Sequence, residues 1–188
     1  METFFHGSSA LFDKFDLSHI LKGDGKIRFG YGVYLTSSFS SAAHYSGANR
    51  SANTHYVYTV LIPDLTSCNH IDFKQCVHPS IVSRAEQLLN LSIPAKATYD
   101  GKDFRKHLAR TLTGKADLEG EKAASEFLSK IGVDYIVWPY CWRNRSLGSN
   151  IVVMDSEKIK ITKIEQVELN SKVQLIPGSE RLVKDFNI

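Results

Sequence analysis

The chain contains 188 residues, of which 43% are hydrophobic and 23% are charged, and its formal net charge is +3. This length and composition fit a single globular domain and exclude a collagen-like or extensively disordered chain. No apolar run reaches the roughly 18 residues that span a bilayer. A charge this mildly basic does not by itself identify a nucleic-acid-binding protein.

The N-terminal segment and the cysteines together predict a cytoplasmic protein. Residues 1–15 have no basic leading region and carry acidic residues early, which is unlike a secretory signal. The three cysteines, Cys68, Cys76 and Cys141, are few and odd in number, as is typical of a reducing compartment. We expect no association with membranes.

Strand and turn signals dominate the N-terminal third of the chain. They predict, in order, a strand at 1–6, a loop over 7–30, a turn at 30–32, a strand at 33–36, a helix that begins at Ser40 and a strand at 55–62 that ends at Pro63.

Three amphipathic segments follow, and then short β-rich runs. They predict helices at 79–91, 101–113 and 118–131, the last followed by Gly132 as its C′ residue, strands at 134–138, 150–154 and 158–164, and a mixed tail at 165–188. The exposed side of the second helix is expected to be basic, with Lys102, Arg105, Lys106, His107 and Arg110. Strands at both ends with helices between them predict an α+β fold.

Three short features have a chemistry in common. They are His6-Gly7-Ser8 after the first strand, the run Gly30-x-Gly32-x-Tyr34-Leu-Thr, and Ala42-x-x-Tyr45, in which Tyr45 follows Tyr34 by eleven positions. Tyrosine rings can enclose a flat polar ring, and a glycine lets its backbone approach an amide closely. Alone, His6 is as typical of a structural histidine as of a functional one. A glycine turn is common, and Tyr45 alone is more typical of core packing than of a binding site. Their order and spacing together favour a binding site.

The segments HGSS, GYGVYLT and SSAAHY resemble the start of the ADP-ribosyltransferase fold shared by diphtheria toxin and the poly(ADP-ribose) polymerases, the His-Tyr-Glu type. The resemblance is closest to small bacterial and phage-borne domains. The segments ASEFLSKIGVDYIVWP and SNIVVMDSEKIKI are similar to the C-terminal half, so that the resemblance covers most of residues 4–162. It implies two small, packed, antiparallel-rich β-sheets around an NAD cleft, with flanking helices.

The resemblance also implies roles for individual residues. His6 would bond the adenosine-side ribose, and Ser8 would contact ribose. Gly7 would hold the nicotinamide carboxamide through its backbone. Tyr34 would form a wall of the pocket, and Tyr45 would stack on the nicotinamide. NAD is then the co-substrate, and no metal is expected.

One residue departs from the family pattern. A glutamate opens the corresponding strand in the family, where it binds the 2′-hydroxyl of the nicotinamide ribose and stabilises positive charge as nicotinamide leaves. Asn150 occupies that place here; it can keep a hydrogen bond but supplies no charge. Asp155 and Glu157 are nearby carboxylates, but strand alternation gives no reason to place either in the pocket. A turn residue before a strand is the alternative interpretation of Asn150.

The loop predicted at 139–149 precedes the strand of Asn150, and by the resemblance it presents the acceptor. Trp138 lies at its root, and the candidate acceptor-binding residues are Tyr140, Trp142, Arg143 and Arg145. Aromatic residues interleaved with arginine suit unstacked bases and phosphates, and they equally suit a protein interface. The basic helix at 101–113 slightly favours nucleic acid as the acceptor. This preference is weak, and both acceptor classes stay open.

Two pairs, Cys68-x-His70 and Cys76-x-His78, have the residue types of zinc ligands. Their spacing is shorter than the usual knuckle, so a zinc site is not expected. Cys141 has no identifiable base and is interpreted as a loop cysteine rather than a nucleophile.

We therefore expect an ADP-ribosyltransferase domain at 1–164 and a C-terminal extension, 165–188, that packs on or continues it. Its function would be transfer of ADP-ribose from NAD to a macromolecular acceptor, nucleic acid or protein. The family analogy suggests a bacterial toxin of a toxin–antitoxin or anti-phage defence system, with an antitoxin protein as partner. Two alternatives remain: a module that binds NAD or ADP-ribose without turnover, and an NAD glycohydrolase.

Overall fold

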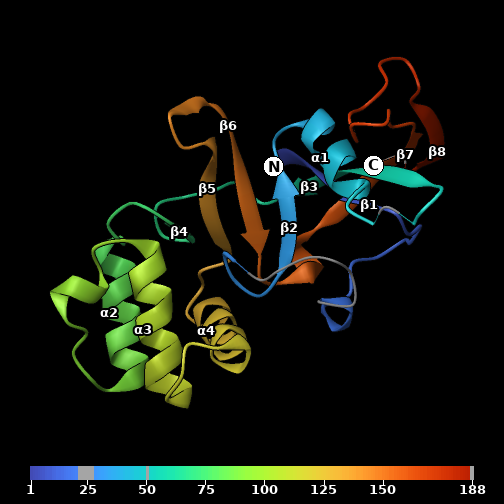
Figure 1. Cartoon of the computed structure of the whole chain (residues 1–188). Helices are drawn as coiled ribbons and strands as arrows, with labels where there is room; N and C mark the ends of the chain where they lie inside the picture. The colour runs from blue at the N-terminus through green and yellow to red at the C-terminus, as the bar shows by residue number, and fades with distance from the viewer. Residues whose placement is uncertain (21–27, 50, 187–188) are drawn as a thin grey trace.

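A computed structural model describes residues 1–20, 28–49 and 51–186. These residues form an α+β structure, as predicted, with one mixed eight-stranded sheet in the order β4-β5-β6-β2-β1-β3-β7-β8 (Figure 1). The strands are β1 (Glu2–Ser8), β2 (Val33–Thr36), β3 (His55–Ile62), β4 (His70–Asp72), β5 (Tyr135–Cys141), β6 (Asn144–Val153), β7 (Lys160–Val167) and β8 (Arg181–Asp185). The α-helices are α1 (Phe39–Ser46), α2 (Pro79–Leu89), α3 (Gly101–Thr113) and α4 (Leu118–Lys130).

The sheet consists of two halves that meet only narrowly. β4 is parallel to β5, and the other neighbours are antiparallel. β1 pairs with β3 along its whole length, whereas β1 and β2 share one paired position, Phe5 with Thr36, within the described residues. Two separate packed sheets were expected. The described strands instead form one continuous sheet that is nearly divided between β1 and β2.

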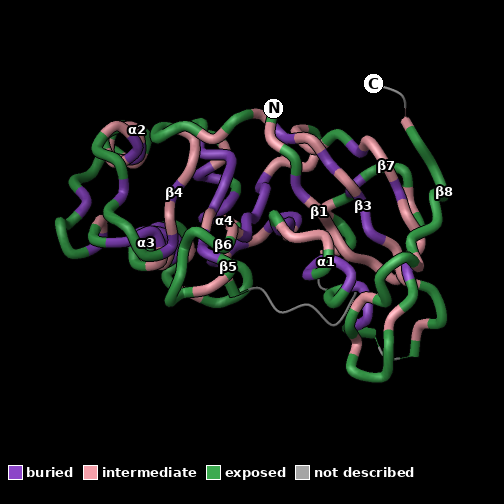
Figure 2. Tube along the Cα trace, turned by 90° about the horizontal axis from the view of Figure 1, so that it is seen from above, coloured by how far each residue is buried: buried purple, intermediate pink, exposed green. Residues whose placement is uncertain are grey.

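The three long helices cover one half of the sheet, and α1 lies over the other half on the same face. Phe104 and Leu108 of α3 and Leu128 of α4 pack against Ile136 of β5 and Val152 of β6 in one buried cluster. A second cluster fills the opposite face, with Phe4, Phe15, Tyr58 and Tyr135 among its members. Figure 2 shows the buried stretches along the central strands, whereas β8 at the sheet edge is exposed throughout.

The helices begin and end at residues with the expected capping chemistry. Asp100 accepts a hydrogen bond from the Asp103 amide at the start of α3, and Asp117 does the same for Gly120 at the start of α4. The predicted bounds of α3 are confirmed, and α2 and α4 end one or two residues earlier than predicted. Gly132 follows the C-cap of α4 with a φ of +77°, which confirms its predicted place.

Several sequence predictions differ from the structure. Arg105 is only 2% exposed, so the prediction that it belongs to the exposed basic side of α3 is wrong. The predicted loop at 139–149 is a β-hairpin, because β5 continues to Cys141 and β6 begins at Asn144. β4 was not predicted, β7 extends to Val167, and the tail contains β8. Part of the predicted loop at 7–30, residues 21–27, lies outside the described residues.

Within the described residues, no helix combines the length and the hydropathy that crossing a membrane requires.

Candidate functional site

His6 lies at the point where the two halves of the sheet separate. Its Nδ1 donates a hydrogen bond to the Tyr34 carbonyl oxygen at 2.9 Å, one residue beyond the Phe5–Thr36 pair. Beyond this contact, toward Gly7 and Ser8, no further pair forms between β1 and β2 in the described part of the chain. The hydrogen bond from the His6 side chain thus takes the place of backbone pairing between β1 and β2. It connects the two halves of the sheet through the backbone of Tyr34, which is itself a candidate site residue.

The surroundings of His6 fix its protonation state and its tautomer. Its ring packs edge-on against Phe15 at 5.1 Å and lies 6.0 Å from Tyr58. Burial lowers the pKa of His6, and the bond to the Tyr34 carbonyl only partly offsets that shift, so that the ring is neutral near pH 7. A carbonyl can only accept, so Nδ1 carries the proton and Nε2 has a lone pair. No described residue bonds Nε2, which can therefore accept from a ligand hydroxyl rather than donate to it.

Tyr34 and Asn150 point to the same face of the sheet. Tyr34 pairs with Val152, and Thr36 pairs with Asn150. Side chains two positions apart on a strand share a face, and directly paired residues do so as well. The ring of His6 packs among the cluster on the opposite face, so that the candidate site spans the sheet at the gap between β1 and β2.

Backbone groups hold the Tyr34 ring in place. Its hydroxyl accepts hydrogen bonds from the amides of Arg28, at 3.2 Å, and Phe29, at 3.1 Å, and donates to the Gly30 carbonyl at 3.0 Å. Its ring meets Trp138 edge-on at 5.7 Å. Burial raises the pKa of Tyr34, and the two amide hydrogen bonds work against that shift. Tyr34 therefore remains a neutral phenol whose orientation is set before any ligand binds.

Asn150 is 7% exposed, and its side chain makes no hydrogen bond to any described residue. Buried amides are normally hydrogen-bonded. The start of its strand segment is fixed, because Ser37 N donates to the Ser149 carbonyl at 2.9 Å and Ser149 N donates to Ser37 Oγ at 3.0 Å. Asn150 therefore presents an unused donor and acceptor from a rigid position. It lies within β6 rather than in a turn, so the alternative interpretation as a turn residue is wrong.

Gly7 allows α1 to lie directly on β1. A Cβ atom at Gly7 would come within 1.7 Å of the Ala42 carbonyl oxygen and 2.8 Å of Ser46 N. This close approach is a structural reason for glycine at this position. Tyr45, next to Ser46, is 59% exposed at the C-terminal end of the same helix. Ser8 accepts a hydrogen bond from Ala10 N at 3.0 Å and so supports the turn that follows β1.

The two carboxylates near β6 are engaged elsewhere. Asp155 accepts from the amide of Glu157 at 3.0 Å, and Glu157 forms an ion pair with Lys14 at 2.7 Å. Asp155 follows Asn150 by five residues, about 16 Å along an extended strand. Neither carboxylate takes the place of the missing glutamate in this structure.

The β5–β6 hairpin projects from the sheet (Figure 1). Two aromatic residues on it are exposed. Tyr140 is 47% exposed and Trp142 is 51% exposed, and Arg143 is exposed between the strands. Arg145 is instead bound by Asp72 of β4, with nitrogen–oxygen distances of 2.8 and 3.4 Å. This ion pair raises the pKa of Arg145. Arg145 thus anchors the hairpin, whereas Arg143 is the arginine left at its tip.

Three members of the two Cys-x-His pairs have partners of their own. Cys68 Sγ contacts Ser80 Oγ at 3.5 Å, His70 Nδ1 bonds the Thr66 carbonyl, and His78 caps α2. Among the residues that the structure describes, no group of three or more His, Cys, Asp or Glu is arranged to hold a metal ion.

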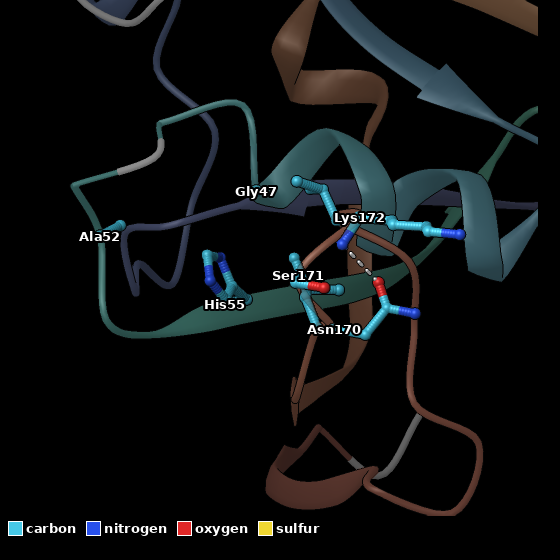
Figure 3. Close-up of a pocket in the computed structure, with 8 residues that line it drawn as sticks. Gly47, Ala52, His55, Asn170, Ser171 and Lys172 are labelled. Carbon is cyan, nitrogen blue, oxygen red and sulfur yellow. Dashed lines mark hydrogen bonds between the residues drawn. The ribbon is translucent and has the colours of Figure 1, made fainter.

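A hollow of about 370 Å³ lies on another part of the surface, between the end of α1, the start of β3 and the loop after β7. Figure 3 shows His55 and Ser171 on its wall, with Lys172 N donating to Asn170 Oδ1 at 2.9 Å. It includes none of the residues singled out from the sequence. The side chain of His44, one position before Tyr45, reaches the same loop through the Val173 carbonyl at 2.7 Å.

Three residues shape the candidate site in ways that the sequence does not indicate, namely Phe29, Arg105 and Glu121. Phe29 stacks on Trp138 at 4.1 Å, and a buried ion pair joins Arg105 to Glu121. The pairing of Arg105 with Glu121 leaves no local pattern in the sequence, because it depends on how α3 and α4 pack.

Comparison with protein-family models, with curated proteins and with solved structures finds no match to this chain.

Proposed function

We propose that the protein is an NAD-dependent ADP-ribosyltransferase that uses the gap between β1 and β2 as its NAD site. The observation that carries the proposal is His6, a neutral histidine held by the Tyr34 carbonyl where the strands diverge, with Nε2 unpaired. The sequence resemblance assigns a ribose contact to this histidine. A neutral Nε2 has the lone pair that a ribose hydroxyl needs as its acceptor.

The other candidate residues fit the same ligand. Tyr34 supplies a fixed aromatic wall, and Tyr45 supplies an exposed ring from α1 that can close the other side of the nicotinamide. Asn150 has an unused amide that can bond a ribose hydroxyl. Gly7 lies at the edge of the gap, and its backbone is assigned to the carboxamide by the resemblance alone.

The chemistry requires the bond between nicotinamide and the ribose C1′ to break. Its electron pair goes to the nicotinamide nitrogen, which neutralises the pyridinium ring, and positive charge develops on the ribose. A lone pair on the acceptor then forms the new bond to C1′, and the acceptor loses its proton to water. The protein contributes positioning and electrostatics to these steps.

Asn150 limits the rate of this reaction. An amide dipole stabilises the developing positive charge less than a carboxylate does, and loss of such a group costs on the order of a hundred- to a thousand-fold in rate. This residue favours a second candidate function, a module that binds NAD or ADP-ribose without turnover. The biological role of a toxin with a protein antitoxin rests on the family analogy.

The acceptor would dock on the β5–β6 hairpin. Tyr140 and Trp142 offer exposed stacking faces, and Arg143 offers a positive charge between them. Arg145 leaves this set, because Asp72 already neutralises it. The remaining residues suit either nucleic acid or protein.

Incubation of a cell lysate with NAD labelled on its adenylate part tests the proposal. Label in macromolecules that resists protease but not nuclease identifies a nucleic-acid acceptor, and the reverse identifies a protein acceptor. Release of free ADP-ribose alone identifies a glycohydrolase. Absence of both label and nicotinamide release would leave the binding module.

A further inference from the structure

A buried ion pair links α3 to α4 beneath the segment that precedes β2. Arg105 Nη1 lies 2.8 Å from Glu121 Oε2, and the two side chains are 3% and 12% exposed. Burial lowers the pKa of Arg105 and raises the pKa of Glu121, and each charge partly offsets the shift of the other. Burying such a pair costs desolvation energy that its attraction often does not exceed. The pair is therefore a poor device for stability alone.

The guanidinium also contacts the backbone of residues 28–31. Arg105 Nη2 donates to the Arg28 carbonyl at 3.4 Å. From α4, Ser125 Oγ accepts from Tyr31 N at 3.0 Å. Phe29 between them stacks on Trp138 at 4.1 Å and lies 4.8 Å from Phe73. Groups from both helices and from β5 thus hold this short segment.

The same segment holds Tyr34. Two of its amides donate to the Tyr34 hydroxyl, and one of its carbonyls accepts from it, as described above. Gly30 has a φ of +138°, and a Cβ there would come within 2.5 Å of Ile136 Cδ1. The segment therefore depends on one conformation, and that conformation surrounds the phenol with backbone partners.

We infer that Arg105 and Glu121 are positioning residues for Tyr34, acting through the backbone of residues 28–31. The inference rests on the proposed function for its consequence in catalysis, because Tyr34 is the pocket wall of the proposed NAD site. A rigid wall lowers the entropy lost when nicotinamide binds. Loosening the segment then raises KM for NAD, even in a protein that is fully folded.

Replacing both charges by apolar side chains separates positioning from stability. In the double variant Arg105→Met, Glu121→Leu no charge is left buried without a partner, and such replacements are often neutral or stabilising. Lys163→Ala is the matched control, because it breaks the partly buried Lys163–Glu165 pair, 2.7 Å long, on β7. Amide hydrogen exchange of Arg28, Phe29 and Tyr31 is measured by NMR, together with thermal unfolding and KM for NAD.

The expected result is an unfolding temperature equal to or above that of the wild type. Exchange of the three amides accelerates by about tenfold or more, and KM for NAD rises on the order of fivefold with a smaller change in kcat. Arg105→Lys keeps the positive charge but not the forked donor geometry of the guanidinium. Its amide exchange rates and KM for NAD should lie between those of the wild type and those of the double variant. The control variant shows neither change.

Unchanged amide exchange in a folded double variant would overturn the inference. If the exchange accelerates but the wild type neither binds NAD nor releases nicotinamide, the positioning of Tyr34 stands and the proposed function fails. If the wild type is active and KM does not move while exchange accelerates, the role of the segment in NAD binding is refuted.

Discussion

The two sides of the candidate site differ in how firmly they are held. On the β2 side, backbone hydrogen bonds, Trp138 and a buried ion pair fix Tyr34. On the α1 side, Tyr45 is 59% exposed and stands at the end of an eight-residue helix. The difference indicates a preformed wall opposed by an adaptable one. It also predicts that changes on the two sides have different consequences for stability and for binding.

The largest effect is expected at Asn150, which lies on β6 beside β2. Asn150→Glu supplies the charge that a developing oxocarbenium ion requires, so nicotinamide release should rise about a hundredfold. The measurement is nicotinamide release by the purified protein under saturating NAD. Asn150→Gln is the control, since it keeps the amide without adding charge, and it should give no gain. An equal rate in the wild type and in Asn150→Glu would contradict the role given to this position.

Removing the adaptable wall should weaken binding without affecting the fold. Tyr45→Ala loses base stacking worth about 1–3 kcal/mol, so KM for NAD should rise roughly tenfold. The free energy of unfolding should change by less than about 0.5 kcal/mol, because the ring is exposed. Tyr45→Phe should behave like the wild type. A loss of stability in Tyr45→Ala without a change in KM would identify Tyr45 as a packing residue.

His6 connects the two sides, and the roles of its two ring nitrogens can be tested separately. His6→Asn places an amide where Nδ1 stood, which keeps the donor to the Tyr34 carbonyl and removes the Nε2 acceptor. We expect NAD affinity to fall about five- to tenfold, as for loss of one hydrogen bond, with the fold retained. Isothermal titration calorimetry measures the affinity. Equal affinity in the variant would show that Nε2 does not contact the ligand.

The smallest effect is a dependence of stability on pH. The pKa of His6 is lowered by folding, so the unfolded chain binds a proton more readily than the folded chain. Stability is therefore complete above the unfolded pKa of about 6.5 and is lost as pH falls below it, by at most about 1.4 kcal/mol per pH unit. Denaturant unfolding between pH 7.5 and 5 should show a steeper loss in the wild type than in His6→Asn. Parallel curves would show that another group is responsible.

The sequence predicted the secondary structure well where local signals decide it. The bounds of α3 were predicted from its amphipathic pattern, and in the structure Asp100 is its N-cap and Gly114 is its C-cap. The β5–β6 hairpin was interpreted as a loop, because Pro139 and the exposed aromatics conceal the strand pattern. β4 is three residues long, and among the described strands its one partner is β5, so its formation depends on tertiary packing.

The candidate site shows the same limit. The residue types of His6, Tyr34 and Tyr45 could be selected from the sequence, but their states could not. The neutral form of His6 depends on a carbonyl 28 residues away and on surrounding rings. Arg105 has the helix position of a solvated charge, and its burial follows from Glu121 on α4. Contacts between distant segments have no local pattern in the sequence.

NAD titration followed by amide NMR tests the central claim most directly, because it does not require turnover. We predict shift changes that cluster at His6, Gly7, Tyr34, Tyr45 and Asn150 and that saturate with NAD. The β1–β2 gap would be rejected as the NAD site if NAD left these amides unchanged, or if the changes clustered instead at His55 and Ser171 around the hollow beside α1.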